Sequence, residues 1–285
     1  MKDHKISIDP KDWEDYSLID AGNRQKLERW GDVITIRPEI NANFSPKLDF
    51  NTWKNQADYI FFQDENRKKG SWKKLNAHSP EVWSIDVEGV KAELKLTQFK
   101  HLGIFPEQID NWRFIKQHVN AGDKVLNLFA YTGLASVIAK SQKGDVYHVD
   151  SVKQLISWAR QNMELSKLSD IRWVHEDAFK FAKRCQKRGQ KFDLIIMDPP
   201  AYGIGANKER WKIEDKMEEL IQTASKILAP NGKLVINTYT PKINLAELTF
   251  LANKYFANKN ITPNNLWMKS EAGDEVFYGN IIRIV

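Results

Sequence analysis

The segment of the sequence with the plainest chemical content is a carboxylate followed by two prolines and an aromatic ring, Asp198-Pro199-Pro200-Ala201-Tyr202. It follows the apolar run 194–197, which is short enough for a strand buried on both faces of a parallel sheet. The prolines fix the backbone dihedrals and remove two amide donors, so the chain must turn there. Such a turn can present a carboxylate, carbonyl oxygens and a ring to a ligand, although a polar loop that only ends a strand has the same composition.

Two further aspartates end neighbouring segments. Asp150 follows the apolar residues 146–149, and Asp177 follows the segment 171–175. In a doubly wound sheet the ligand crevice lies outside the carboxyl ends of the strands, where a carboxylate can accept hydrogen bonds from ribose hydroxyls or an adenine amine. Each aspartate alone could simply cap the next helix. Three of them in register, together with the Asp-Pro-Pro turn, predict a site for a ligand that contains adenosine.

The turn after the first strand of this pattern selects between such ligands. Residues 125–133 read Val-Leu-Asn-Leu-Phe-Ala-Tyr-Thr-Gly and contain a single glycine, Gly133. A dinucleotide enzyme needs Gly-x-Gly-x-x-Gly here so that backbone amides can approach a pyrophosphate, and Phe129 and Tyr131 fill that space. NAD is therefore disfavoured. S-adenosylmethionine contains adenosine without a phosphate, so a less open turn can bind it through backbone contacts.

A parallel sheet is needed to position these residues, and the sequence predicts one. Strands and helices alternate at the spacing of β-α-β units from about residue 120. Strands are expected at 124–129, 145–150, 171–175, 192–197, 233–239, 265–269 and 277–284, and helices at 133–142, 152–166, 178–188, 211–228 and 245–256. Ser151 and Asp177 stand where helix N-caps belong, and Pro230-Asn231-Gly232 is expected to end the fourth of these helices. The predicted class is α/β, a Rossmann-like sheet of seven mostly parallel strands with helices on both faces.

The region before this pattern, residues 1–93, is expected to form a small, mostly β accessory region for substrate recognition. Alternating segments at 32–37, 58–63 and 82–87 are separated by turn signals. Its five tryptophans form either an aromatic core or a stacking surface for bases, and a core is the commoner outcome. The second domain is placed at 94–285, and it includes a lead-in strand and a helix at 109–118 within residues 94–120.

Composition narrows the function further. The single cysteine, Cys185, excludes an intramolecular disulfide, and the six histidines show no ligand spacing, so no metal is expected. No apolar run could span a membrane and no signal core occurs, which favours a cytoplasmic protein without a membrane contact. The net charge is +6, and the excess lies in residues 121–285, because residues 1–120 carry 19 basic and 19 acidic side chains. This bias is compatible with a polyanionic partner, and the oligomeric state stays open.

From about residue 94 the chain resembles the class I S-adenosylmethionine-dependent methyltransferases. It is most similar to the bacterial group that contains the 23S ribosomal RNA large-subunit methyltransferases acting on cytosine C5 or guanine N7. The matching motifs are Leu126-Asn127-Leu128-Phe129-Ala130-Tyr131-Thr132-Gly133, Val149-Asp150, Ala159-Arg160-Gln161-Asn162, Glu176-Asp177-Ala178-Phe179 and Met197-Asp198-Pro199-Pro200-Ala201-Tyr202-Gly203. They specify the fold and the cofactor more than the substrate.

The resemblance implies a set of site residues. The turn after the first strand would bind the methionyl part of the cofactor, Asp150 the ribose and Asp177 the adenine, with Asp198 beside the methyl group. The residues implied for the cofactor are Gln108, Asn127, Phe129, Ala130, Tyr131, Thr132, Gly133, Asp150, Ser151, Asp177, Ala178 and Asp198, and those for catalysis are Asp198, Pro199, Pro200 and Tyr202. The basic segment with Lys208, Arg210 and Trp211 is expected to contact the substrate or to be a solvated face with a packed tryptophan.

Three departures from the family pattern bear on function. Ile109 follows Gln108 where relatives often have arginine, and Arg113 is a possible substitute. Some relatives carry an N-terminal PUA-type RNA-binding domain, which is not expected in the residues before 94. Cytosine C5 methylation needs a thiolate that adds to the ring, yet residues 237–240, where related enzymes place the cysteine, read Asn-Thr-Tyr-Thr. Since Cys185 lies in a basic helix instead, the C5 reaction is not expected.

Transfer to nitrogen needs no covalent adduct. Asp198 and the Pro199 carbonyl can accept the hydrogens of an exocyclic amine while Tyr202 stacks on the base, and a ring nitrogen such as guanine N7 mainly needs positioning. We therefore expect a methyltransferase that acts on a base of RNA, ribosomal RNA first, with nitrogen preferred over cytosine C5. The alternatives are a methyltransferase of a protein or small molecule and a catalytically silent RNA-binding factor.

Overall fold

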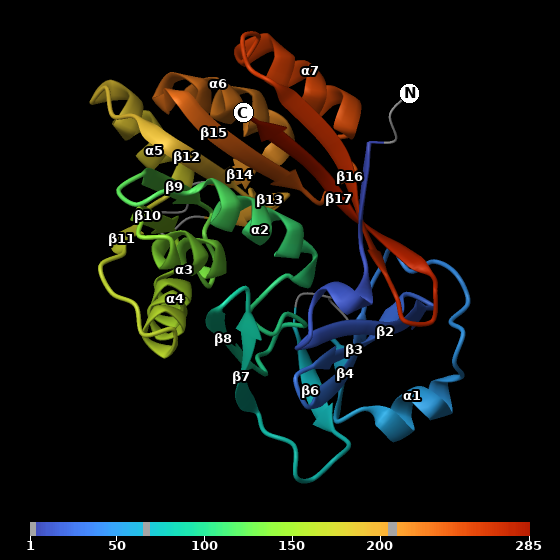
Figure 1. Ribbon diagram of the computed structural model, residues 1–285. Coiled ribbons are helices and arrows are strands. Elements are labelled where there is room, and N and C mark those ends of the chain that lie inside the picture. The colour runs from blue at the N-terminus through green and yellow to red at the C-terminus, as the bar shows by residue number, and fades with distance from the viewer. Residues whose placement is uncertain (1–3, 65–68, 205–209) are drawn as a thin grey trace. The chain divides into compact units, whose positions relative to one another are not determined.

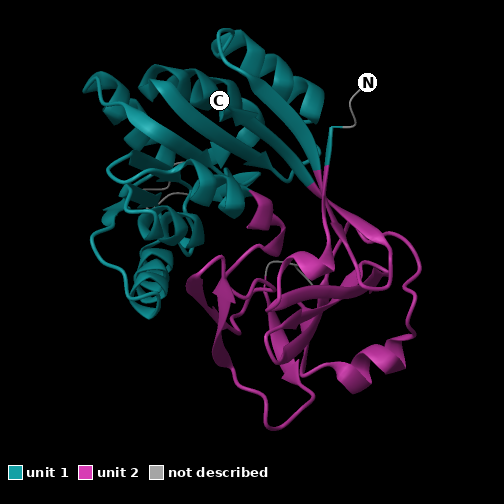
Figure 2. Cartoon of the chain, in the orientation of Figure 1, with its two compact units in different colours: residues 1–5, 111–265, 279–285 teal, residues 6–110, 266–278 magenta. Residues whose placement is uncertain are grey.

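The computed structural model describes residues 4–64, 69–204 and 210–285 (Figure 1). The chain forms two compact units, which have different colours in Figure 2. The first unit comprises residues 1–5, 111–265 and 279–285, and the second comprises residues 6–110 and 266–278. The chain therefore passes between the units several times, and neither unit is one continuous stretch of sequence.

The larger sheet has eight strands in the order β1-β16-β17-β15-β12-β9-β10-β11. These strands are β1 (Lys5–Ile8), β9 (Lys124–Leu128), β10 (Asp145–Asp150), β11 (Arg172–His175), β12 (Phe192–Met197), β15 (Leu228–Thr238), β16 (Ile261–Lys269) and β17 (Glu275–Ile284). β9 is parallel to both β10 and β12, β10 to β11, and β12 to β15, while β17 is antiparallel to β15. All seven expected strands are present, which confirms the predicted α/β class, and β1 adds an eighth.

Helices cover both faces of this sheet (Figure 1). One face carries α2 (Ile109–His118), α3 (Leu134–Ser141) and α4 (Lys153–Leu165), and the other carries α5 (Ala178–Lys187), α6 (Ile213–Ile227) and α7 (Leu245–Tyr255). Successive side chains of a strand point to opposite faces, so β9 serves both layers. Leu126 and Leu128 are fully buried in the core formed with α5, α6 and α7, whereas Asn127 bonds Ser136 of α3.

Two local predictions are wrong because strand pairing overrides local propensity. The helix expected from residue 211 begins at Ile213, since β14 (Arg210–Lys212) pairs with β13 (Tyr202–Ile204) in an antiparallel ladder. β15 begins at Leu228, so Pro230-Asn231-Gly232 lies inside a strand instead of forming a turn after the helix. Leu228 pairs with Phe192, and the register shifts before the next pair.

The two expected N-caps have different outcomes. Asp177 caps α5, and its Oδ1 accepts a hydrogen bond from the amide of Lys180 at 2.8 Å. The N-cap of α4 is Val152, without a side-chain bond, so the expectation for Ser151 is wrong. The amide of Val152 donates instead to Oδ1 of Asp150 at 2.8 Å. Asp150, the last residue of β10, therefore supplies the side-chain hydrogen-bond acceptor at the start of α4.

The second unit contains a five-stranded sheet in the order β2-β3-β4-β5-β6. Its elements are β2 (Tyr16–Gly22), β3 (Gln25–Trp30), β4 (Val33–Pro38), α1 (Phe50–Gln56), β5 (Tyr59–Gln63) and β6 (Gly70–Lys74), followed by a hairpin of β7 (Val82–Val87) and β8 (Val90–Lys95). The short 3-10 helices η1 (Pro10–Asp12) and η2 (Pro106–Gln108) flank them. Trp13, Trp30 and Trp53 are buried, so these three tryptophans belong to the core, as the sequence favoured.

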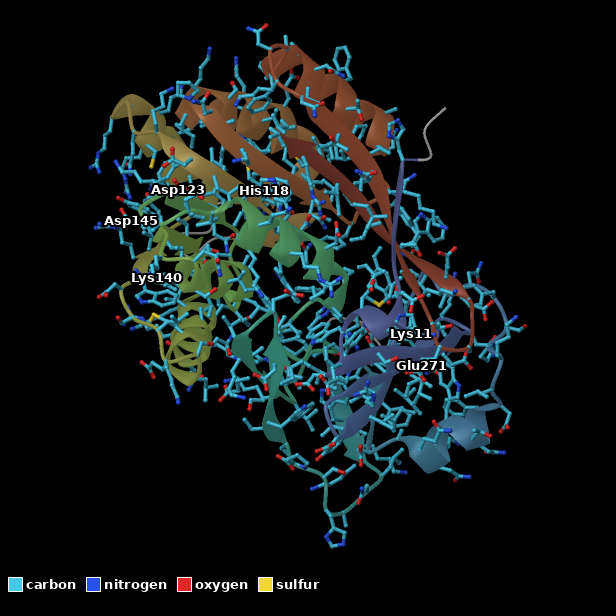
Figure 3. All side chains as sticks on the ribbon, in the orientation of Figure 1. Lys11, His118, Asp123, Lys140, Asp145 and Glu271 are labelled. Carbon is cyan, nitrogen blue, oxygen red and sulfur yellow. The ribbon has the colours of Figure 1, made fainter. Side chains whose placement is uncertain are left out.

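Residues 266–278, which comprise the end of β16, the start of β17 and the turn between them, complete this unit. The amide of Glu271, labelled in Figure 3, donates to the carbonyl of Leu18 at 2.8 Å. Lys26 Nζ donates to the hydroxyl of Tyr278 at 2.8 Å. The compact units divide the chain at other residues than the predicted boundary between 93 and 94, which stays a prediction about functional domains.

Charged side chains are buried in the second unit. Arg37 Nη2 donates to Glu28 Oε1 at 2.8 Å, and Lys26 Nζ lies 3.2 Å from carboxylate oxygens of both Glu28 and Glu39. Burial opposes ionisation of Glu28, but the charges of Arg37 and Lys26 outweigh it and lower its pKa to about 2. Glu107 differs, because burial dominates there and raises its pKa to about 7. Ionisation of the buried Glu107 carboxyl therefore destabilises the folded state.

Candidate active site

The larger sheet has a topological switch point at β9. β10 and β11 lie on one side of β9, and β12 and β15 lie on the other. Leu128, the last residue of β9, is level with Val149 of β10 and with Met197 of β12. The next residue of each chain segment, Phe129, Asp150 or Asp198, therefore lies at the same edge of the sheet. Ligands of open α/β sheets bind at such an edge, outside the carboxyl ends of the strands.

The turn after β9 has an unusual backbone. Phe129 and Tyr131 both have positive φ, 57° and 52°, although neither is glycine. For non-glycine residues this left-handed conformation costs about 1–2 kcal/mol each, so surrounding contacts must maintain it. The amide of Ala130 donates to Val149 of the neighbouring strand at 3.1 Å. Asn162 of α4, fully buried, donates its side-chain amide to the carbonyl of Thr132 at 2.9 Å.

Gly133 ends the turn and begins α3, and only glycine fits there. Its φ is 78°, and a Cβ would lie 2.7 Å from the Ala159 Cβ and 3.0 Å from His148 Cε1. Real Cβ atoms do not approach other atoms so closely, so a larger residue would push α3 away from α4. The small side chain of Ala159 thus explains part of the motif 159–162, and the Asn162 bond explains another part.

A buried polar chain fixes α3 to the sheet below it. Asn127 of β9 donates to Ser136 Oγ at 2.9 Å, and that hydroxyl lies 3.1 Å from His148 Nδ1 of β10. Burial lowers the pKa of His148 to about 3, so its ring is neutral at physiological pH. The side-chain amide of Asn127 is therefore engaged in this buried chain of hydrogen bonds. Its expected contact with the cofactor stays a prediction.

Asp150 is held by the backbone on both sides of it. Its Oδ2 accepts from the amide of Tyr131 at 2.9 Å, and its Oδ1 accepts from the amide of Val152 at 2.8 Å. Burial raises the pKa of Asp150, and these amide bonds oppose that shift. Each of these carboxylate oxygens accepts one amide hydrogen and can accept a second hydrogen bond, for example from a hydroxyl group. This arrangement fits a ribose, the assignment that the sequence predicted.

The Asp198 turn is tied to the elements around it. Trp211 donates its indole N–H to the carbonyl of Pro200 at 2.6 Å, and the amide of Ile213 donates to Ala201 at 3.1 Å. Tyr202, in contrast, is 53% exposed and is available to a ligand. The turn therefore combines a fixed backbone with an accessible ring.

Trp211 packs instead of presenting a free face. It is 6% exposed, and its ring centroid lies 4.9 Å from that of Phe129 and 6.3 Å from that of Phe179. It thus links the turn after β9 to the turn after β12. Of the other expected substrate contacts, Arg210 is exposed on β14, and Lys208 lies outside the described residues.

Tyr239 is a site residue to which the sequence reasoning assigned no role. It follows β15, and its hydroxyl donates to Asp198 Oδ2 at 3.5 Å, a long hydrogen bond. The signal that could have identified Tyr239 is a polar residue that follows the fifth strand, because that strand ends beside the fourth. Gln108 ends η2 in the second unit, so its expected contact with the cofactor stays a prediction.

The opposite edge of the sheet also has a cavity, of about 430 Å³, and its lining combines basic with acidic side chains. It is lined by Lys140 and Asp145, both labelled in Figure 3, and by Arg172 at the start of β11. Arg172 Nε lies 2.8 Å from Asp145 Oδ1. The carboxyl edge with Asp150 and Asp198 is therefore the better candidate.

The chemistry of Cys185 is limited by its position. Its side chain is 2% exposed on α5, and burial raises its pKa to about 11. A nucleophilic cysteine needs a low pKa and access, and this thiol has neither. Within residues 4–64, 69–204 and 210–285 no group of three acidic, histidine or cysteine side chains could hold a metal ion, and no helix is long and apolar enough to cross a membrane.

Comparison with known proteins identifies the fold and the cofactor. Residues 49–254 match the model of the S-adenosylmethionine-dependent methyltransferase family. The chain belongs to this family. Its cofactor is S-adenosylmethionine.

Relatives of this methyltransferase are known by structure and by sequence. It is 32% identical to an S-adenosylmethionine-dependent methyltransferase from Agrobacterium tumefaciens, with a TM-score of 0.92 over 98% of this chain and 93% of the other. The crystal structure of SMU.776 with SAH shares the fold, with a TM-score of 0.73 at 21% identity over 92% and 72% of the two chains.

Two curated relatives carry the names of ribosomal RNA methyltransferases. Ribosomal RNA large subunit methyltransferase K/L of Shewanella oneidensis is 30% identical over 68% of this chain and 28% of its own length. Ribosomal RNA large subunit methyltransferase I of Aeromonas salmonicida is 30% identical over 53% of this chain and 38% of its own length. The methyltransferase thus spans between a quarter and two fifths of the length of these relatives.

Proposed function

We propose that this methyltransferase transfers a methyl group to a nitrogen atom of a base in RNA, with ribosomal RNA as the substrate class. The observation that carries the proposal is the Asp198-Pro199-Pro200 turn, which places a carboxylate and carbonyl oxygens at the end of β12, beside the turn after β9. The names of the Shewanella and Aeromonas relatives support RNA as the substrate.

The cofactor lies, in this proposal, across the ends of β9, β10 and β11. The backbone of Phe129, Ala130, Tyr131, Thr132 and Gly133 binds the amino acid part. Asp150 with Ser151 binds the ribose, because its two fixed oxygens can each accept a further hydrogen bond. Asp177 with Ala178 borders the adenine, with Oδ1 of Asp177 engaged at the start of α5. Asn127 supports the turn from below.

S-adenosylmethionine supplies an electrophilic methyl group on a sulfonium. The Asp198 carboxylate and the Pro199 carbonyl accept hydrogens of the target amine, which directs its lone pair toward the methyl group. Tyr239 orients Asp198, Trp211 holds the Pro200 carbonyl, and Tyr202 stacks on the base. If the acceptor is an exocyclic amine, Asp198 takes up the proton that the amine loses as the nitrogen–carbon bond forms and the sulfur–carbon bond breaks. If the acceptor is a ring nitrogen such as guanine N7, no proton is lost and the site only has to position the base.

Nitrogen is preferred over cytosine C5 because of the thiol. The C5 reaction requires a cysteine that adds to the ring, and the single cysteine of the sequence is buried with a raised pKa. No adduct is needed for nitrogen, which already carries a lone pair. The residues around Asp198 are therefore sufficient.

The test uses radiolabelled S-adenosylmethionine and ribosomal RNA from cells that lack this protein. We expect label in RNA, a methylated nitrogen by nucleoside mass spectrometry, and a loss of about 100-fold or more in rate for Asp198→Asn. The matched control is Asp215→Asn, an exposed aspartate of α6, which should keep the rate. Label in 5-methylcytosine contradicts the nitrogen assignment, and label only in protein or small molecules contradicts the RNA assignment.

A further inference from the structure

The second unit carries a cleft of about 720 Å³ that the chemistry at Asp198 does not use. Such a volume is typical of a small-ligand site. The apolar side chains of Leu48, Trp53 and Ile60 line it. Two further aromatic side chains line it and remain accessible, since Phe50 is 40% and Phe62 is 51% exposed. Exposed aromatic side chains in a cleft indicate a ligand with a flat, apolar face.

One wall of the cleft is held by a buried carboxylate. Asp20 is fully buried, and its Oδ2 accepts from the amide of Leu48 at 2.8 Å and from the Trp53 indole at 3.0 Å. The same wall requires a glycine at position 22, because the backbone of Pro46 lies so close that a Cβ on Gly22 would be 2.3 Å from the Pro46 nitrogen. The cleft is therefore formed by the fold itself, and a ligand does not have to create it.

Polar groups on the cleft suit a nucleotide. The amide side chains of Asn23 and Gln25 can donate and accept at the edge of a base. Lys47 and Lys54 also line the cleft, and Lys54 Nζ lies 4.7 Å from the centre of the Phe50 ring. Cations beside exposed rings are the combination with which proteins bind single-stranded nucleic acids.

Among the described residues that line the cleft, Asp49 is the one carboxylate, and it is already engaged. Asp49 caps α1, and it accepts from the amides of Asn51 and Thr52 at 2.9 Å and 3.1 Å and from the Thr52 hydroxyl at 2.6 Å. Its hydrogen bonds lower its pKa. Lys47 Nζ lies 3.4 Å from Asp274 Oδ1, but an apolar peptide that filled the floor would offer no polar group to the amides or to Lys54. A nucleotide uses both the apolar and the polar part of the lining.

We propose that this cleft binds an unpaired nucleotide of the RNA substrate, with the base stacked on Phe50 or Phe62 and a phosphate beside Lys54. The inference rests on the proposed function in so far as RNA is the substrate. It adds a recognition site on the second unit that is independent of the methyl-transfer residues. The cleft selects single-stranded over paired RNA, because only an unpaired base can enter and stack.

Binding of a short, fluorescein-labelled oligoadenylate to the full chain, followed by anisotropy, tests this proposal. The variants are Phe50→Ser and Phe62→Ser, and the matched control is Phe250→Ser, a 65% exposed phenylalanine of α7 in the other unit. Loss of one base–aromatic contact should weaken binding about 5- to 150-fold. The Phe250 variant should bind as the parent does, and all variants should bind S-adenosylmethionine with unchanged affinity.

The outcomes separate this inference from the proposed function. No binding of the oligoadenylate by the parent chain, or equal binding by the Phe50 and Phe62 variants and the Phe250 control, overturns the cleft as a nucleotide site. Methylation of RNA that is insensitive to both cleft variants also overturns it and leaves the methyl-transfer proposal intact. Weaker binding in the cleft variants, with no methylation of any RNA, supports the cleft and removes the proposed reaction.

Discussion

Asn162 connects the interior of α4 to the strained turn after β9, which makes its replacement an informative perturbation. Asn162→Leu keeps the branch of the side chain at Cγ and removes the donor to the Thr132 carbonyl. Thr132 is 1% exposed and Asn162 is fully buried, so water cannot replace the bond. A buried acceptor that loses its partner costs about 1–3 kcal/mol. We expect the free energy of unfolding to fall by that amount.

The effect on cofactor affinity follows from the backbone of the turn. Phe129 and Tyr131 together hold about 2–4 kcal/mol of left-handed strain, at about 1–2 kcal/mol each. Without the Asn162 bond the turn can relax to conformations that do not fit the cofactor, and binding must restore the strained one. If the lost 1–3 kcal/mol appears in binding, the Kd for S-adenosylmethionine rises about 5- to 150-fold.

Isothermal titration calorimetry and urea unfolding measure the two quantities. Glu164→Leu is the matched control, since it places the same residue on the exposed side of the same helix. The reasoning is refuted if Asn162→Leu lowers stability but leaves the Kd within about twofold of the parent value. That result would mean that Asn162 only packs and does not set the turn.

Three further predictions concern residues outside that contact. Burial raises the pKa of Glu107 from 4.5 to about 7 in the folded protein, so the protonated carboxyl stabilises the fold at low pH and this contribution is lost as the pH rises through that window. By urea unfolding, the free energy of unfolding of Glu107→Gln should equal that of the parent at about pH 4 and exceed it by about 3 kcal/mol at about pH 8. Trp211→Phe keeps the packing on Phe129 but loses the donor to Pro200, so the methylation rate should fall about tenfold with an unchanged cofactor Kd, whereas an unchanged rate would remove its positioning role. Cys185→Ala should retain the methylation rate, and a loss of a thousandfold or more would show that the thiol takes part in the reaction.

The repeating strand–helix part of the fold could be predicted because its signals are local. Hydrophobic periodicity and the flanking turns predicted α2 at its observed bounds, and the apolar run before Asp198 predicted β12. Other features depend on partners distant in sequence. The pairing of Leu228 with Phe192 converts Pro230-Asn231-Gly232 into strand, and the ladder between β13 and β14 shortens the following helix. Neither pairing is encoded within the segment itself.

The same contrast between local signals and distant partners applies to the candidate site. The places of Asp150 and Asp198 at strand ends could be predicted because a carboxylate after an apolar run is visible in the sequence. Asn162 lay within a recognised motif, but its bond to Thr132 joins residues thirty positions apart. Tyr239 gained a role only because β15 lies next to β12. Local sequence shows which residues end strands, and tertiary pairing decides which polar side chains reach the turns.

The discontinuous second unit has a consequence for the order of events during synthesis. Residues 6–110 leave the ribosome well before Glu271 and Tyr278, which bond Leu18 and Lys26. The buried Lys26 therefore lacks one of its partners until Tyr278 has been made. The amino-terminal part must wait, incompletely folded, while the intervening sheet forms. A chain that stopped before residue 266 would lack this part of the second unit and would leave the interior around Lys26 incomplete.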